Sequence, residues 1–263
     1  MRVRKASGPL EVLAVAGTRC VLLAIDLPKD EARGLLGFAM ARRKGSTGAF
    51  RYLEGKKVFK SIVPNPAPKD EFPSNKHPIQ SFLWSTYTAE PDTTYGFKIE
   101  ALYGAPGSPE TRHTVSIEVK TESETDGMHR VWFNRGAVAS QAFSETFNNK
   151  SLTPEEKVDP NSPETKWLSR GLLEACLAFI NDTKDDEPLR VAAKAFPVPP
   201  VLKALKAAIY RGVDGRIVYG ADKDNDKAIA DTGIPAKKGN RQILTQRTHA
   251  KIPHNKFFVR LVG

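Results

Sequence analysis

The sequence predicts an α+β protein of two domains, in which an N-terminal antiparallel β-sandwich precedes an α/β domain. Apolar and polar residues alternate in the first half, as expected for strands with one buried face. Helical and strand patterns alternate in the final third, which is typical of a sheet covered by helices. The polar stretch NNKSLTPEEKVDPNSPETK between them, with its prolines and mixed charges, is typical of a linker. We therefore place the sandwich region at residues 1–148, the linker at 149–165 and the α/β domain at 166–263.

The first strands are predicted to form a hairpin over residues 10–27. Two apolar segments, EVLAVA and CVLLAIDL, flank a turn at Gly17-Thr18-Arg19. Further strands are predicted at residues 36–43, 58–63 and 131–134.

The clearest alternation lies in the segments TYGFKIEALYG and HTVSIEVKTE. The inward-facing residues of this predicted antiparallel pair are Tyr95, Phe97, Ile99, Ala101, Val115, Ile117 and Val119. The segment AEPDTTYGFKIEAL resembles the corner of a fibronectin type III or immunoglobulin-like sandwich, in which a proline and a small polar residue precede a tyrosine. The resemblance implies that Tyr95 is the corner tyrosine and Trp84 a core aromatic. Since many unrelated proteins use such sandwiches, it implies a scaffold or a substrate-positioning module and no particular chemistry.

The second half contains two apolar helical stripes. One runs through residues 167–180, and the other follows Pro199 and Pro200, which suit a helix start, and ends at Gly212. Strands are expected at residues 189–196 and in DGRIVYGA, and a helix at residues 137–147. The run ADKDNDKAIADTG has aspartates at alternate positions, as in a calcium loop, but lacks the glycine and the closing glutamate of an EF-hand. We interpret this run as a solvated loop.

The chain of 263 residues carries a formal net charge of +10, which favours an anionic partner such as nucleic acid or an anionic lipid surface. Many soluble proteins are also basic, so the distribution of charge is more informative than its sum. From Thr232 onward the sequence contains no Asp or Glu. The basic residues of this segment are Lys237, Lys238, Arg241, Arg247, Lys251, Lys256 and Arg260.

The two cysteines, Cys20 and Cys176, fall in different predicted domains. We therefore expect no disulfide and a reducing, cytoplasmic location. No apolar run approaches the ~18–20 residues that a spanning helix needs. The N-terminal apolar stretches are short and broken by charge, so we expect neither a secretion signal nor a transmembrane segment.

The run IPHNKFFV near the C-terminus places His254 and Lys256 two residues apart on a predicted strand. This spacing puts both side chains on one face. A histidine beside a fixed cation suits attack on a phosphodiester, because the cation offsets the charge of the phosphate oxygens while the imidazole attacks phosphorus. The predicted substrate is a phosphate ester, although the pair without its context is more typical of an exposed strand end.

In context, the pair resembles the H-x-K motif of the phospholipase D superfamily. The apolar residues 257–259 and the preceding helix-strand-helix-strand order match that family over residues 164–263. The resemblance implies that His254 attacks phosphorus, that water releases the resulting phosphohistidine, and that Lys256 holds a nonbridging oxygen. No metal or other cofactor is predicted, because no histidine has metal-binding spacing. The residues expected to bind the substrate are Asn255, Lys251 and Arg247.

The chain departs from the family pattern in three respects. Leu261 stands where the pattern H-x-K-x4-D has its aspartate, no G-S-x-x-N segment follows, and only one H-x-K lies on a predicted strand, whereas the family uses a second histidine to protonate the leaving oxygen. We therefore expect a truncated chain whose second motif lies beyond Gly263, or a homodimer that supplies it. Two interpretations follow: a phosphodiesterase acting on nucleic acid or phospholipid, and a catalytically silent binding or assembly module.

Overall fold

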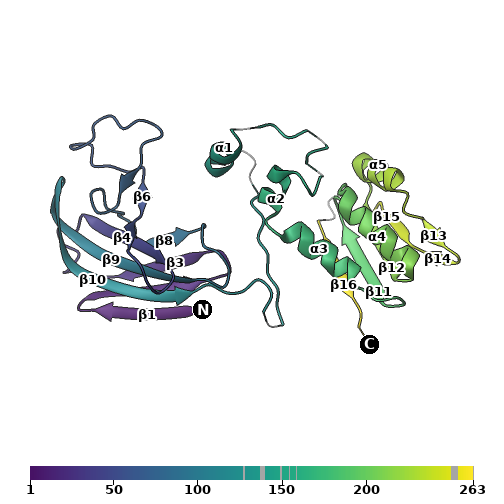
Figure 1. The fold of residues 1–263 in the computed structure, drawn as a ribbon, viewed down its shortest axis with the longest axis horizontal. Coiled ribbons are helices and arrows are strands. Elements are labelled where there is room, and N and C mark those ends of the chain that lie inside the picture. The colour runs from purple at the N-terminus through teal and green to yellow at the C-terminus, as the bar shows by residue number, and fades with distance from the viewer. Residues whose placement is uncertain are drawn as a thin grey trace. The chain divides into compact units, whose positions relative to one another are not determined.

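The computed structural model describes residues 1–126, 128–136, 140–148, 150–153, 155–157, 159–249 and 254–262. The chain divides into two compact units, Met1–Val131 and Trp132–Gly263, which are called the first and the second unit (Figure 1). The domain limits at residues 148 and 165 stay a prediction.

The first unit contains two four-stranded antiparallel sheets. The first sheet has the order β1 (Arg2–Ser7), β2 (Leu10–Ala16), β3 (Val21–Asp26) and β8 (Leu83–Thr86). The second has the order β10 (Ser108–Lys120), β9 (Thr94–Ala105), β4 (Gly37–Lys44) and β5 (Arg51–Tyr52). Two further short strands, β6 (Glu54–Gly55) and β7 (Phe72–Pro73), pair antiparallel with each other. Apolar side chains from both sheets form one core, so the unit is a β-sandwich, as predicted.

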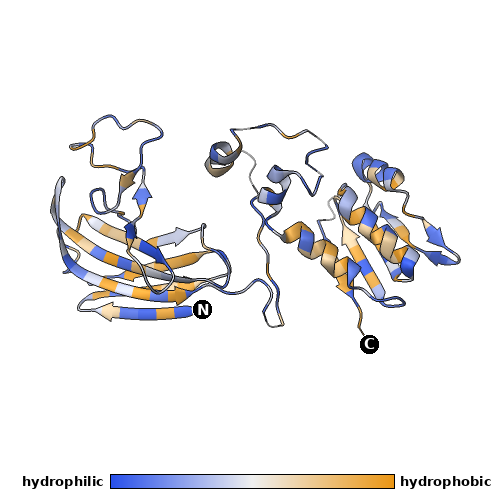
Figure 2. Cartoon of the chain, viewed as in Figure 1, coloured by the Kyte–Doolittle hydropathy of each residue, from blue (hydrophilic) through white to orange (hydrophobic). Residues whose placement is uncertain are grey.

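The alternation predicted for the two longest strands is confirmed, and Figure 2 shows it along the strands of the first unit. The predicted inward-facing residues, Tyr95, Phe97, Ile99 and Ala101 in β9 and Val115, Ile117 and Val119 in β10, are all buried. The predicted hairpin is present too, because β2 and β3 pair antiparallel from Glu11 opposite Asp26 to Ala16 opposite Val21. A core lined by two alternating faces follows directly from this spacing.

Tyr95 occupies the corner position that its sequence context predicts. Its buried hydroxyl accepts a hydrogen bond from the backbone amide of Glu90 at 2.9 Å. The Thr121 hydroxyl donates to the Glu90 carbonyl at 2.6 Å, so both backbone groups of Glu90 are held. Trp84 is half-buried and packs edge-on against Phe97, with ring centroids 6.3 Å apart. These contacts fix the chain where it enters β9.

Two strands predicted for the first half are wrong, and several were missed, among them β1 and the short strands β5, β6 and β7. Residues 58–63 form turns, in which the Ile62 and Val63 amides both donate to the Phe59 carbonyl at 2.9 Å. Residues 131–134 form no strand. Strand β1 was missed because its charged residues show no apolar alternation; it lies at the edge of its sheet, where exposed charges are common.

The second unit contains a four-stranded sheet in the order β15-β12-β11-β16. Strands β11 (Pro188–Ala193), β12 (Asp214–Gly220) and β15 (Leu244–Arg247) are parallel, and β16 (Lys256–Arg260) runs antiparallel to β11. A short hairpin of β13 (Lys237–Lys238) and β14 (Arg241–Gln242) precedes β15. The arrangement agrees with the predicted α/β layer, although the finer expectation of half a phospholipase D-like domain stays a prediction.

Three of the helices bury one face of this sheet. The five helices are α1 (Gln141–Phe147), α2 (Pro163–Ser169), α3 (Leu172–Asn181), α4 (Pro199–Arg211) and α5 (Lys223–Thr232). Ile180 of α3, Leu205 of α4 and Ile229 of α5 share a core with Leu189 and Ile217 of the sheet. Among the described helices, none is both long and apolar enough to cross a bilayer.

The predicted helix at residues 199–211 is confirmed, but two other predictions need correction. The stripe over residues 167–180 belongs to two helices, because Arg170 (φ 54°) and Gly171 (φ 88°) adopt left-handed conformations that end α2. The run ADKDNDKAIADTG is no solvated loop. Asp222 caps it by accepting a hydrogen bond from the Asp224 amide at 2.9 Å, and α5 follows.

The tyrosine corner gives a testable expectation. Tyr95→Phe leaves the Glu90 amide without its acceptor, so we expect the free energy of unfolding of the first unit to fall by about 1 kcal/mol. Native-state hydrogen exchange of the β9 and β10 amides measures this loss without interference from the second unit. Tyr87→Phe is the matched control, because the Tyr87 side chain is 75% exposed and its loss of a hydroxyl should leave exchange unchanged. Equal effects of the two changes would contradict the role given to the corner.

Candidate functional site

The two motif residues meet at the edge of the sheet where the parallel strands end. The Nζ atom of Lys256 lies 3.0 Å from Nδ1 of His254 and donates to the His254 carbonyl at 3.2 Å. Lys256 is the first residue of β16 and stands opposite Ala193, the last residue of β11. Both motif side chains are exposed. Ligands of open α/β sheets bind at this carboxyl edge, so the pair is well placed to meet one.

Asn255 connects the motif to the neighbouring strands. Its carbonyl accepts a hydrogen bond from the Lys194 amide at 2.9 Å, and its Oδ1 atom lies 3.4 Å from a guanidinium nitrogen of Arg247. Arg247 is the last residue of β15 and pairs with Gly220. Arg247 and Asn255, both predicted to bind substrate, therefore lie together beside the motif. Lys251 lies outside the described residues, and its role stays a prediction.

A buried amide holds the two central strands together at this edge. Asn225, in the first turn of α5, is fully buried. Its Nδ2 donates to the Lys194 carbonyl at 2.7 Å and to the Gly220 carbonyl at 2.9 Å, while its Oδ1 accepts from the Phe196 amide at 2.7 Å. A Cβ atom on Gly220 would lie only 2.7 Å from the Lys194 carbonyl oxygen, so the close approach of β11 and β12 requires glycine there.

Sequence reasoning missed Asn225, although a signal was present. Asp222, Asp224 and Asp226 are the N-cap and first-turn acids of α5, a pattern that marks a helix start. Reading the same acids as a solvated loop hid the asparagine between them. Asp226 also reaches the edge, since its Oδ1 accepts from Gln246 Nε2 at 3.0 Å. Burial, and then the nearby Asp226 carboxylate, raises the pKa of Tyr219 in β12.

Position 261 lies at the other end of β16. The Leu261 amide donates to the carbonyl of Pro188, the first residue of β11, at 3.0 Å. Leu261 is five positions after Lys256 along extended chain, which corresponds to roughly 16 Å. An aspartate at this position would stand at the opposite edge of the sheet, so Leu261 does not remove a direct contact to His254.

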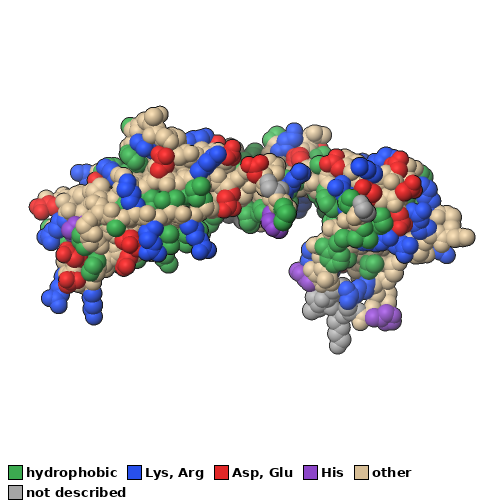
Figure 3. Space-filling view, turned by 90° about the horizontal axis from the view of Figure 1, so that it is seen from below, with side chains coloured by type: hydrophobic (Ala, Val, Ile, Leu, Met, Phe, Trp, Pro, Cys, Tyr) green, Lys and Arg blue, Asp and Glu red, His purple; other side chains and the backbone are tan. Residues whose placement is uncertain are grey.

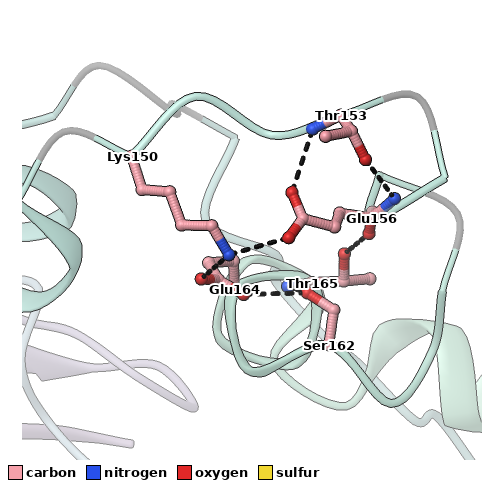
Figure 4. Close-up of polar contacts among 6 residues, drawn as sticks. All are labelled: Lys150, Thr153, Glu156, Ser162, Glu164 and Thr165. Atoms are coloured by element: carbon pink, nitrogen blue, oxygen red, sulfur yellow. Dashed lines mark hydrogen bonds and ion pairs between the residues drawn. The ribbon is translucent and has the colours of Figure 1, made fainter.

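A second polar cluster lies in the segment between residues 150 and 165 (Figure 4). The ammonium group of Lys150 donates to Glu156 Oε1 at 2.8 Å and to Glu164 Oε1 at 2.9 Å. The Ser162 hydroxyl donates to Glu164 Oε2 at 3.0 Å, and the Thr165 hydroxyl donates to the Glu156 carbonyl at 2.6 Å. Because its charges and donors satisfy one another, we interpret this cluster as structural.

The remaining titratable groups give no further centre. Among the residues that the structure describes, no three His, Cys, Asp or Glu side chains are grouped so as to hold a metal ion. Cys20 and Cys176 are both free thiols, and burial raises the pKa of Cys176. On the face shown in Figure 3, Lys and Arg side chains are spread over both units with Asp and Glu among them. The positive charge is therefore not confined to the motif.

Comparisons with known proteins give partial matches to solved structures. No protein-family model matches the chain, and no curated protein matches it. A structure described as "Myokine structure" is 16% identical, with a TM-score of 0.29, and the match covers 45% of this chain and 99% of that one. The fibronectin type III domain of human fibronectin type III domain containing protein 3 is 14% identical, with a TM-score of 0.27 and coverages of 47% and 85%. The FN5 domain of Drosophila Lar is 14% identical, with a TM-score of 0.25 and coverages of 43% and 91%. TM-scores this low carry no argument, so the description of the sandwich rests on its strand pairing.

The buried amide of Asn225 leads to the first expectation for this edge. Asn225→Ala leaves two carbonyls and one amide unpaired, so the free energy of unfolding of the second unit should fall by about 3 kcal/mol. Hydrogen exchange of the β11 and β12 amides measures this loss. Asn181→Ala, an exposed asparagine at the end of α3, should have little effect. A similar loss in both variants would show that Asn225 does not hold the edge.

The cluster around Lys150 predicts a pH dependence. The hydrogen bond from Lys150 lowers the pKa of both the Glu156 and the Glu164 carboxyls. A carboxyl whose pKa is lower in the folded state stabilises that state above its unfolded pKa, about 4.3, and loses this contribution as pH falls through the folded value. Protease resistance of residues 150–165 should therefore decrease as pH drops below about 4.3. Lys150→Met should flatten this dependence, whereas Lys157→Met, in the same segment, should preserve it.

Proposed function

We propose that the chain is a phospholipase D-like phosphodiesterase in which His254 is the nucleophile and Lys256 binds a nonbridging phosphate oxygen. The observation that carries the proposal is the exposed pair of Nδ1 and Nζ atoms, 3.0 Å apart, at the carboxyl edge of the sheet. An imidazole and an ammonium at this separation can contact one phosphate together. Arg247 and Asn255, beside the pair, would bind further substrate oxygens.

The contact between the two side chains constrains the proposed step. While Lys256 donates to Nδ1, a neutral His254 carries its proton on Nε2, which cannot then attack phosphorus. Attack through Nε2 requires a proton on Nδ1 and therefore a displaced lysine. A phosphate dianion or diester oxygen offers Lys256 an anionic acceptor in place of the neutral ring nitrogen. Substrate binding would thus free the imidazole and place the cation at the same time.

A complete site of this kind needs a second histidine to protonate the leaving oxygen. The H-x-K at residues 254–256 leads into β16, whereas the same spacing at residues 249–251 ends outside the described residues. We infer that a second copy of the motif comes from a homodimer partner or from further sequence. For the first unit we propose a fibronectin type III/immunoglobulin-like scaffold, supported by the tyrosine corner at Tyr95. A cytoplasmic location remains part of the proposal.

A catalytically silent binding or assembly module is the second candidate. One observation favours it. Among the described residues that hydrogen-bond His254, the side-chain partner is Lys256, and no carboxylate is there to hold a proton on Nδ1. A histidine without such an orienting acid is a weaker nucleophile. The two candidates differ in whether His254 forms a covalent bond with phosphorus.

Hydrolysis of bis-p-nitrophenyl phosphate in EDTA tests the proposal. We expect slow release of p-nitrophenol by the unaltered chain, and a loss of at least about 100-fold in His254→Ala because the nucleophile is absent. His129→Ala is the control, since His129 is an exposed histidine in the first unit. Its activity should equal that of the unaltered chain. Acid-labile, base-stable labelling by a radioactive phosphodiester should disappear in His254→Ala alone.

Activity that survives His254→Ala would overturn the assignment of the nucleophile. The binding module would be favoured if the unaltered chain released no p-nitrophenol at any protein concentration, and if it also released none when mixed with a longer chain that carries a second motif. Release of headgroup from liposomes with no cleavage of oligonucleotides would make phospholipid the substrate.

A further inference from the structure

One face of the sheet in the second unit has no helix over it among the described residues. Helices α3 and α4 cross the opposite face (Figure 1), and α5 joins the same core. Alternation sends Leu189, Val191 and Ile217 toward the helices and their neighbours to the other side. The side chains of Val218 (39% exposed), Phe257 (47%) and Val259 (39%) lie on that open face. An exposed sheet face with an aromatic residue on it marks an interaction surface.

The strand register arranges the open face in two rows. The upper row, which is nearer the carboxyl ends of the parallel strands, crosses four strands. Its residues, paired in this order, are Thr245, Val218, Ala192 and Phe257. The lower row contains Arg216, Arg190 and Val259. Arg247 stands above the upper row, opposite Gly220. The face therefore has an apolar centre with arginines on both sides of it along the strands.

The lower arginines converge on a single carboxylate. Asp214 Oδ2 lies 2.7 Å from Arg190, and its Oδ1 lies 3.1 Å from Arg241 and 3.9 Å from Arg216. Burial opposes ionisation of Asp214, but the hydrogen bond and charge of Arg190, followed by Arg241 and Arg216, outweigh it and lower the pKa of the carboxyl. Three positive charges around one negative charge leave an excess of two. The Arg216 side chain, which is the most exposed of the three, can reach an outside anion.

From this face we infer a binding site for single-stranded nucleic acid, with Phe257 stacked on a base and Arg216 and Arg241 against phosphates. A flat sheet bearing an exposed aromatic and flanking cations suits unpaired bases, which have a free ring face, whereas the bases of a duplex are already stacked. Charge complementarity favours a polyanion over a second copy of the chain, because face-to-face dimerisation would bring two positive clusters together.

The inference goes beyond the proposed phosphodiesterase, because binding on this face does not require His254 to react. The two would act in sequence if both hold. A nucleic-acid strand that extends beyond the upper row would pass Arg247, whose guanidinium lies 3.4 Å from Asn255 of the motif.

Fluorescence anisotropy of a labelled dT12 oligonucleotide, in EDTA and with the full chain, tests the site. We expect binding that weakens with salt, with a slope of log K against log salt of about −1.4 for two phosphate contacts. Phe257→Ala should weaken binding about tenfold and Phe257→Trp should retain it. Arg216→Gln should reduce the steepness of the salt dependence by about 0.7. The controls are Tyr210→Ala and Lys227→Gln, both exposed on the helices that cover the other face.

Each binding measurement is repeated with His254→Ala added to the unaltered chain and to each variant. The binding result then does not depend on whether His254 is a nucleophile. Equal binding by Phe257→Ala and Tyr210→Ala, or preference for a duplex of the same length, would overturn the inference. Light scattering would also overturn the inference if it showed that anionic vesicles or a second copy of the chain bind the open face and that Phe257→Ala abolishes this binding.

Discussion

The close approach of β11 and β12 at their carboxyl ends is the constraint on which the second unit depends. Three hydrogen bonds from one buried side chain, Asn225, join the two strand ends and the chain that follows β11. A buried amide with unpaired groups would destabilise the edge, whereas a fully paired one makes it rigid. The Lys194 amide, on a residue held by Asn225, donates to the Asn255 carbonyl inside the motif. A backbone hydrogen bond therefore fixes the position of His254 and Lys256 relative to the sheet. Helix α5, which carries Asn225, supports the candidate site as β16 does.

Most of the fold could be predicted where burial imposes a period on the sequence. Phe97 and Ile99 mark the buried face of β9 because a strand with one wet side must alternate. The failures lie where another interaction decides. Residues 58–63 are apolar enough for a strand, but the Ile62 and Val63 amides form turn hydrogen bonds with the Phe59 carbonyl. Strand β1 has no apolar period, since pairing with β2 requires only its backbone.

The proximity of His254 and Lys256 could be predicted from the sequence, whereas the contacts that support them could not. The spacing of His254 and Lys256 is local, and a period of two is enough to bring their atoms together. Asn225 reaches the same edge through β12 and a helix start, so its role depends on tertiary pairing that no local pattern contains. Position 261 shows the reverse case. A family pattern links it to the motif by sequence, yet the antiparallel pairing of β16 with β11 carries it to the opposite edge, beside Pro188.

Strand β16 also explains how one short segment can serve two surfaces. Lys256 and Phe258 pair with Ala193 and Val191, which face the helices, whereas Phe257 and Val259 pair with Ala192 and Arg190 on the open side. A shift of the register by one residue would exchange the two sets, placing Lys256 on the open side and Phe257 toward the helices. Since Phe258 packs on the helix-covered core, its burial opposes that shift. The same apolar contact therefore keeps Lys256 at the carboxyl edge and the Phe257 ring on the exposed face.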